Sequence, residues 1–455
     1  MSNYSTESKF TLKTAVLSFQ HMFAMFGATI TVPILCNMSI SVALLAAGIG
    51  TLLFYFLTNK KVPVFLGSSF AFIPGLATIM SGAGAIGSDT WNVAMGKASI
   101  AVMIAGLVYV VLAFLIKKIG VEKIKKAFPP VVVGPIIILI GIILIPKTFY
   151  NNILMPIQWN GIAAWKQWST AIVTLATILL TNAFAKKNSF LKVVPILLSF
   201  AVGYVYALCI GIVDFSHCDW TKIVIFQDLK TTFGFYGSMS FDWTAILAIA
   251  PIALVTFMEH IGDINANSNI CNKNFMVDPG LHRTVLGDGV ATIAAGAIGG
   301  PPNTTYGENT AVLAITKNYN TKNIFYAALM AIFLGCFTIF GTAISTIPAA
   351  VIGGASMVLY GMIAASGLRT LVESKVDFSN TKNLLIVSTV LAIGLGFSTM
   401  SIIGDAAGAL GGALPGTFFK LMIGNVEISP LALATVVGLV LNALIPDEKK
   451  DEETK

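Results

Sequence analysis

The chain has 455 residues, of which 56% are hydrophobic and only 11% are charged, and its formal net charge is +7. Soluble globular proteins carry roughly 25% charged residues, so the composition excludes a soluble protein and predicts a membrane protein with many spans. The basic residues lie in short connectors between apolar runs, where such residues set the orientation of spans. The positive charge therefore does not indicate binding to nucleic acid.

Apolar runs predict an all-α polytopic membrane protein with 14 transmembrane segments. They lie at 14–35, 40–58, 64–80, 96–118, 129–145, 169–185, 191–213, 244–262, 282–300, 303–316, 323–342, 345–366, 382–396 and 430–446. If the N-terminus is cytoplasmic and the segments alternate, 22 of the 28 Lys and Arg residues face the cytoplasm. Because cytoplasmic connectors are rich in Lys and Arg, this bias favours counting all the segments as crossings and placing both termini inside.

The third segment is interrupted by residues that do not favour a helix. Gly67, Ser68 and Ser69 lie between Pro63 and Pro74, and proline removes hydrogen bonds from a helix. We expect a short extended piece that leaves backbone groups free to face a ligand. The alternative is a kinked packing helix whose hydroxyl groups bond to its own carbonyls.

The tenth segment, within the stretch Gly299–Thr316, is interrupted in the same way. We expect residues 303–307 to be extended and Glu308 to open a half-helix. Non-helical backbone at membrane depth is tolerated only where it lines a cavity or is buried in protein. A carboxylate there marks a functional site by default, and two half-helix N-termini would add partial positive charge.

A short pattern recurs seven segments apart. Pro129 in the fifth segment and Pro348 in the twelfth both begin the pattern Pro-x-x-Val-x-Gly. The two interrupted segments are also seven segments apart. Since seven is odd, the two halves are predicted to be inverted in the membrane. Interrupted helices at corresponding positions of inverted repeats indicate the substrate site of a transporter.

Glu259 and Asp263 in the eighth segment are four residues apart and therefore lie on one helix face. Glu259 follows a long apolar run, so we expect it well inside the bilayer, where acidic residues form proton relays. The alternative is that the helix ends here and both groups lie in the headgroup region. His21 in the first span is either a packing residue or part of the site.

The sequence has no motif for a metal site or for enzymatic chemistry. No set of His, Cys and carboxylate residues has the spacing of metal ligands. A phosphate-binding loop and a nucleophile elbow are also missing. We therefore expect no cofactor, no metal and no enzymatic activity.

Five stretches resemble the nucleobase:cation symporter-2 (nucleobase–ascorbate transporter) family, and most closely its bacterial uracil permeases. They are residues 20–29, 67–72, 259–262, 278–283 and 303–309, the last reading Asn-Thr-Thr-Tyr-Gly-Glu-Asn. The resemblance implies 14 segments in two inverted seven-segment repeats, with segments 3 and 10 each broken by a short β-strand. It also implies a core domain made of 14–118 and 244–342, and a gate domain made of 129–213 and 345–446 that mediates a homodimer.

The resemblance also implies a set of site residues. Glu259 and Glu308 would bind the ring nitrogens of a nucleobase, and the backbone at Phe70 and Gly307 would bond its polar groups. Tyr306 would pack on the ring and Tyr360 would close over it from the gate side. Proton coupling would involve Glu259, Asp263, Glu308 and His21.

The sequence therefore predicts import of uracil by proton symport across a bacterial cytoplasmic membrane. The predicted partners are a nucleobase, a proton, the lipid bilayer and a second copy of the chain. Two positions depart from the family pattern: Ala311 stands where glycine is usual, and Asp263 stands where the uracil permeases carry histidine. A purine permease such as a xanthine permease, or an anion transporter of the same fold, remains as an alternative.

Overall fold

The computed structural model describes residues 11–120, 122–123, 126, 128–159, 161–186, 189–192, 194–216, 220–221, 223–224, 232–409, 422–423 and 426–446. Residues 1–10 and 447–455, at the predicted cytoplasmic ends, lie outside this part of the chain. The chain forms two compact units. The first comprises Met1–Ile119 and Thr148–Val358, and the second comprises Gly120–Lys147 and Leu359–Lys455.

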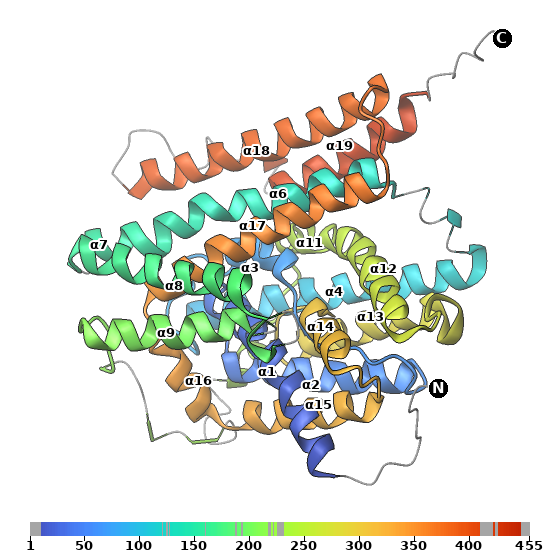
Figure 1. The fold of residues 1–455 in the computed structure, drawn as a ribbon. Coiled ribbons are helices and arrows are strands. Elements are labelled where there is room, and N and C mark those ends of the chain that lie inside the picture. Colours follow the sequence, from blue (N-terminus) through green and yellow to red (C-terminus); the bar gives the residue numbers. More distant parts are fainter. Residues whose placement is uncertain are drawn as a thin grey trace, which may run out of the picture. The chain divides into compact units, whose positions relative to one another are not determined.

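Helices dominate both units (Figure 1). The first unit contains α1 (Leu12–Leu35), α2 (Ile40–Leu57), β1 (Leu66–Ser68), η1 (Phe70–Phe72), α3 (Ile73–Ile79), α4 (Asp89–Ile119), η2 (Tyr150–Leu154), α7 (Met155–Trp159), α8 (Ala164–Phe184), η3 (Phe190–Lys192), α9 (Pro195–Cys209), η5 (Gly234–Ser238), α11 (Trp243–Ile249), α12 (Ile252–Cys271), η6 (Met276–Gly280), α13 (Leu281–Ala297), β2 (Asn303–Thr305), α14 (Gly307–Thr316), α15 (Thr321–Cys336) and α16 (Thr338–Ser345). The second unit contains α18 (Thr381–Ala409), β3 (Met422–Ile423), β4 (Val426–Glu427) and α19 (Pro430–Leu444). Helices α6 (Pro130–Phe149) and α17 (Ala349–Glu373) each contribute residues to both units.

Seven helices in the described part of the chain are long and apolar enough to cross a membrane, and the bent pair α15 and α16 brings the number to eight. Shorter apolar helices, among them α9 and α19, lie between or after them. Each of the predicted apolar segments contains helix. The thirteenth helix runs further than its apolar run predicts, to Ala409. Thr399 in this extension is accommodated within the helix, because its hydroxyl donates to the Leu395 carbonyl at 2.8 Å.

Small residues let pairs of helices approach closely in the first unit. A Cβ atom at Gly48 of α2 would lie 2.7 Å from the Ala328 carbonyl oxygen of α15, and one at Gly106 of α4 would lie 2.7 Å from the Gly289 carbonyl oxygen of α13. Helices α2 and α15 accordingly run side by side (Figure 1). Van der Waals packing through small residues is the usual way in which membrane helices associate.

The start of α11 is held by Asp242, whose carboxylate accepts from the backbone N–H groups of Thr244 and Ala245 and lies 2.7 Å from the Lys97 ammonium nitrogen. Partial burial acts to raise the pKa of the Asp242 carboxyl, but the bonds from Lys97 and the two N–H groups outweigh it and hold the pKa below its ordinary value. A lowered pKa in the folded state stabilises the fold above the unfolded-state pKa. This contribution disappears as the pH falls through the folded-state pKa.

Asp242→Asn is therefore expected to lower stability slightly at neutral pH, by about 0.2–1 kcal/mol as for other surface ion pairs. Asparagine caps a helix about as well as aspartate, so the substitution tests the charge rather than the cap. The thermal midpoint of the purified protein in detergent should differ between the two proteins at pH 7 and converge in acid. A difference that persists at low pH would show that the ion pair is not its source.

Candidate functional site

The centre of the first unit is a two-stranded antiparallel ladder between β1 and β2. Leu66 pairs with Thr305, Gly67 with Thr304 and Ser68 with Asn303. Two further backbone bonds extend it, since Ser69 N–H donates to the Pro302 carbonyl at 2.8 Å and Tyr306 N–H donates to the Phe65 carbonyl at 3.1 Å. Each strand thus satisfies backbone groups of the other, which a lone extended segment inside a membrane protein would leave unpaired.

A helix leaves each strand at its carboxyl end. η1 and α3 follow β1 from Phe70, and α14 follows β2 from Gly307. Because the strands are antiparallel, the two helices begin at opposite ends of the ladder. The first N–H groups of a helix have no partner within that helix, and they carry partial positive charge. Polar backbone donors are therefore present at both ends of the ladder.

Tyr306 braces the ladder from one side. Its ring lies against Gly67, where an added Cβ would be 2.4 Å from a ring carbon. The Tyr306 hydroxyl donates to the Ser68 carbonyl at 2.7 Å and accepts from the Thr29 hydroxyl at 3.3 Å. Tyr306 is only 4% exposed, so this side chain holds β1 against β2 and α1. Its predicted contact with substrate stays a prediction.

The hydroxyl groups of the interrupted segment do not form the bonds that a kinked helix would give them. Ser68 and Ser69 are buried, and within the described part of the chain neither hydroxyl oxygen has a hydrogen-bond partner. Leu66–Ser68 is a strand rather than a turn of helix. Of the two interpretations of this segment, the structure has the extended one.

The carboxylates of α12 lie in the interior of the helix and not at its end. The helix continues for eight residues beyond Asp263 and ends at Cys271, after which Asn272 adopts a left-handed conformation with φ of 50°. Asparagine is one of the few residues that accept this conformation after a helix. The alternative that the helix ends near Glu259 is therefore wrong, because the residues that follow Asp263 remain helical.

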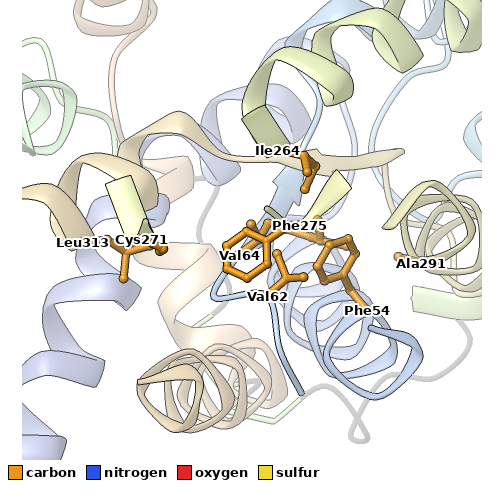
Figure 2. Close-up of a cluster of buried hydrophobic side chains, with 9 residues drawn as sticks. Phe54, Val62, Val64, Ile264, Cys271, Phe275, Ala291 and Leu313 are labelled. Carbon is orange, nitrogen blue, oxygen red and sulfur yellow. The ribbon is translucent and has the colours of Figure 1, made fainter. Parts of the chain in front are cut away.

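The two faces of α12 have different surroundings. On one face, Ile264 and Cys271 belong to a buried apolar cluster with Phe54 of α2 and Phe275, which Figure 2 shows around the start of β1. The other members of this cluster are Val62, Val64, Leu66, Ala291 and Leu313. On the other face, Glu259 is exposed and Asp263 is half-buried. The apolar face fixes the helix, so the carboxylates project from a rigid element.

Six residues of three contacting elements form what we call the accessible cluster. They are Phe70 of η1, Glu259, Gly262 and Asp263 of α12, and Gly307 and Glu308 of α14. Each is exposed or half-buried, whereas their neighbours Ser69, His260, Thr305 and Asn309 are buried. The structure thus brings five predicted site residues, Asp263 among them, onto three elements, with α12 in contact with both η1 and α14.

Two interactions involve the acidic groups of the accessible cluster. The Thr305 hydroxyl of β2 donates to the Asp263 carboxylate at 2.6 Å, which ties α12 to the ladder. The carboxyl groups of Glu259 and Glu308 lie close enough to interact electrostatically. A carboxylate accepts hydrogen bonds from N–H groups, and backbone N–H groups at a helix start are donors. The cluster therefore offers both halves of the hydrogen-bonding pattern of a planar amide.

His21 lies behind this cluster and not in it. It is fully buried on α1, and the Asn309 side-chain amide donates to its carbonyl at 2.9 Å and lies 3.3 Å from its ring Nδ1. Asn309 follows Glu308 in the chain, so His21 helps to position the start of α14. Its predicted part in proton coupling stays a prediction. Tyr360 lies on α17 in the second unit, and its predicted role also remains untested.

Sequence reasoning missed an ionisable pair behind Glu259. The His260 ring Nδ1 lies 2.7 Å from an Asp288 carboxylate oxygen of α13, and both side chains are fully buried. His260 Nε2 lies 2.9 Å from the Thr284 hydroxyl, which itself donates to the Leu281 carbonyl. Asp288 stands inside the predicted ninth span, and an acidic residue within a span was the signal that could have identified it. Within the described residues, no group of three or more potential ligands could hold a metal ion.

Comparison with known proteins identifies a family. A family model described as a permease family matches residues 12–403. The uracil permease of Bacillus caldolyticus is 39% identical over 437 residues, which cover 96% of this chain and 93% of that protein. The uracil permease of Escherichia coli (strain K12) is 38% identical and covers 95% of this chain and 91% of its own. A putative pyrimidine permease, RutG, of the same strain is 35% identical over 88% of this chain and 87% of that protein.

Solved structures with low sequence identity share the fold. The transmembrane domain of a cyanobacterium bicarbonate transporter, BicA, gives a TM-score of 0.57 at 14% identity and covers 95% of this chain and 98% of that one. The structure of SLC26A9 gives a TM-score of 0.60 at 10% identity, over 96% of this chain and 66% of that one. The chain is thus a multi-pass membrane protein with a transporter fold.

The relatives are permeases, which are transporters and not enzymes. The family match extends over most of the chain and includes η1, α12 and α14, which carry the accessible cluster, and the strands β1 and β2 beside them. The chain therefore belongs to the permease family, the nucleobase:cation symporter-2 family that its motifs resemble.

Proposed function

We propose that this permease imports uracil by proton symport and that the accessible cluster is its substrate site. The observation that carries the proposal is that Glu259 and Glu308 are exposed or half-buried, as are Phe70 and Gly307 at the two helix starts. Uracil is a neutral, planar ring whose edges alternate N–H and C=O groups. Carboxylates accept from the N–H groups and backbone N–H groups donate to the carbonyls. The names of the relatives, uracil permeases, support this choice of base.

The residue roles in this proposal follow their positions. Glu259 and Glu308 bind the ring nitrogens, and the backbone at Phe70 and Gly307 bonds the polar edge of the base. Tyr306 packs on the ring of the base. Tyr360 of the second unit closes over the base when the gate moves.

Proton coupling would use the same carboxyl groups. An ionised side chain within the membrane is costly, and protonation removes this cost. Glu259 would share the transported proton with Asp263, which already accepts a hydrogen bond from Thr305. Glu308 would also take part in proton coupling. His21 would act on the start of α14 through Asn309, whose side-chain amide donates to the His21 carbonyl. Binding of base and proton at one cluster links the two fluxes.

We further propose 14 crossings in two inverted repeats, with segments 3 and 10 broken by β1 and β2. The pairing of elements within the first unit supports this arrangement. Segment 2 packs on segment 11 (α2 and α15), and segment 4 packs on segment 9 (α4 and α13). If each segment is replaced by its counterpart seven segments away in the other repeat, the pair 2 and 11 becomes the pair 9 and 4. The same replacement exchanges β1 and β2, so their pairing is unchanged. A two-fold axis in the membrane plane would produce this pattern.

The proposal also includes the predicted division into a core domain and a gate domain that rock against each other. Helices α8 and α9, which the resemblance assigns to the gate, belong to the first compact unit. The proposed core and gate domains therefore differ from the two compact units. A homodimer through the gate domain, a location in the bacterial cytoplasmic membrane and two cytoplasmic termini complete the proposal. The excess of Lys and Arg in alternate connectors supports the orientation.

Uptake of labelled uracil into liposomes tests the function. Uptake should require an inward proton gradient and collapse when a protonophore is added. Glu308→Gln removes a charged acceptor, a loss of about 1.5–3 kcal/mol for a hydrogen bond to a charged group, so the apparent affinity should fall roughly tenfold to 150-fold. Glu373→Gln, which neutralises an exposed carboxylate on α17, is the control and should transport normally.

Two results would contradict the proposal. Uptake that ignores the proton gradient would rule out symport, and normal affinity in Glu308→Gln would remove Glu308 from the site. Competition by unlabelled bases separates uracil from the purine alternative, because a xanthine permease would be inhibited more strongly by xanthine. Inhibition by bicarbonate or chloride but by no base would favour an anion transporter of the same fold.

A further inference from the structure

Gly262 occupies a position where the helix itself gives no reason for glycine. It lies in the interior of α12, between Glu259 and Asp263, and its φ is not in the left-handed range that favours glycine. Glycine in a helix interior is less stable than alanine by about 0.5–1 kcal/mol, because it loses more backbone freedom on folding. The chain therefore accepts a destabilising residue at this point.

Close packing does not explain Gly262 either. A Cβ atom added there would meet no other atom within 4 Å. The glycines of neighbouring α13 differ: a Cβ at Gly287 would lie 2.5 Å from the Phe54 ring, and one at Gly289 would lie 2.8 Å from Tyr109. Those glycines make room for protein atoms. Gly262 keeps space open that no described protein atom fills.

The open space lies on the side of α12 that carries the acidic groups. Gly262 is exposed and follows Glu259 by three residues, so these two positions are neighbours on one helix face, the face that Glu259 shares with Asp263. The buried face of the helix, with Ile264, points to the apolar cluster of Figure 2. A side chain at position 262 would therefore project into the accessible cluster and not into the core.

We propose that Gly262 is a specificity-determining residue that leaves room for the base beside Glu259. This inference rests on the proposed function and deepens it. With hydrogen in place of a methyl group, the flat ring can lie against the backbone of α12 while Glu259 accepts its N–H. A methyl group at this position occupies part of that space. In a protein with this methyl group, larger bases would lose more contact with the site than uracil does. The narrowed site would therefore favour uracil over larger bases more strongly.

The test pairs Gly262→Ala with a matched control, Gly396→Ala. Gly396 also lies inside a long helix, α18, is exposed and has no atom within 4 Å of an added Cβ. Both substitutions remove the same flexibility from a helix, so neither should lower the thermal midpoint of the purified permease in detergent. Equilibrium binding of labelled uracil should weaken about tenfold or more in Gly262→Ala, since one methylene in a binding pocket changes discrimination by 10- to 200-fold, and should be unchanged in Gly396→Ala. Competition by thymine, which carries one more methyl group, should weaken more than competition by uracil.

Each other outcome counts against the proposal. Unchanged uracil binding in Gly262→Ala overturns it. If Gly262→Ala binds uracil normally but takes it up poorly, Gly262 allows helices to pack closely during the transport cycle and does not make room for the base. This outcome also overturns the proposal. A lower thermal midpoint for Gly262→Ala would point to a purely structural role. If the wild-type protein binds no uracil, the proposed function itself fails. If the wild type and Gly262→Ala bind uracil equally well, only the inference about Gly262 fails.

Discussion

His260→Leu is expected to destabilise the protein by about 3–5 kcal/mol, as found when one partner of a buried ion pair is removed. The substitution leaves the Asp288 carboxyl group fully buried without the imidazole that lies 2.7 Å away. Neither Asp288 carboxylate oxygen makes a hydrogen bond to another group within the described residues, so the imidazole is the close polar neighbour that the substitution removes. The measurement is the thermal or denaturant midpoint of the purified protein in detergent.

The control for this prediction removes both partners. His260→Leu combined with Asp288→Ala leaves no carboxyl group to bury, and apolar replacement of a whole buried pair is often close to neutral. The double variant should therefore be more stable than His260→Leu alone. If the double variant is the less stable of the two, the contact between His260 and Asp288 is not what the single substitution disrupts.

Gly67→Ala is expected to have the second large effect, on both stability and uptake. The added methyl group would lie 2.4 Å from the Tyr306 ring and 2.7 Å from the Thr29 hydroxyl. Forcing extra atoms into a packed site costs about 1–3 kcal/mol, and displacing Tyr306 also removes its bond to the Ser68 carbonyl. Since α14 begins directly after Tyr306, Glu308 would move with it.

Two measurements check this prediction. Uracil uptake in Gly67→Ala should fall together with the thermal midpoint. The matched control is Gly237→Ala, because Gly237 in η5 has no atom within 4 Å of an added Cβ, and both quantities should stay near wild type. Normal uptake in Gly67→Ala would show that the position of Tyr306 against β1 does not govern the site.

Much of the local architecture follows from residue types alone. The apolar runs located the helices because burial in a bilayer requires long apolar stretches, although α4, α17 and α18 extend past the runs that predicted them. The prolines around Gly67 and before Asn303 indicated where helix would stop, because proline lacks the N–H that a helix needs. The spacing of Glu259 and Asp263 placed both on one face because it matches the helical period. The resemblance to the family then implied that the carboxylates of Glu259 and Glu308 bind the substrate.

Other features could not be predicted because they depend on partners far apart in the sequence. Nothing near Asp288 in the chain indicates that His260 lies against it, since the contact joins two helices. The position of Tyr306 behind the ladder depends on Gly67, more than two hundred residues away. The end of the helix after Asp263 was ambiguous because polar asparagines follow it, and Asn267 is polar yet buried. Its amide donates to the Pro63 carbonyl at 3.3 Å, a bond that the sequence does not reveal.

By itself, the sequence determined the class of protein, the apolar helices, the two interruptions and the carboxylates, because each depends on local composition or on a period within one segment. The tertiary structure alone decided the register of β1 on β2, the buried pair behind Glu259 and the open space at Gly262. These depend on which distant atoms share a volume, and close packing settles that only when all the helices are in place.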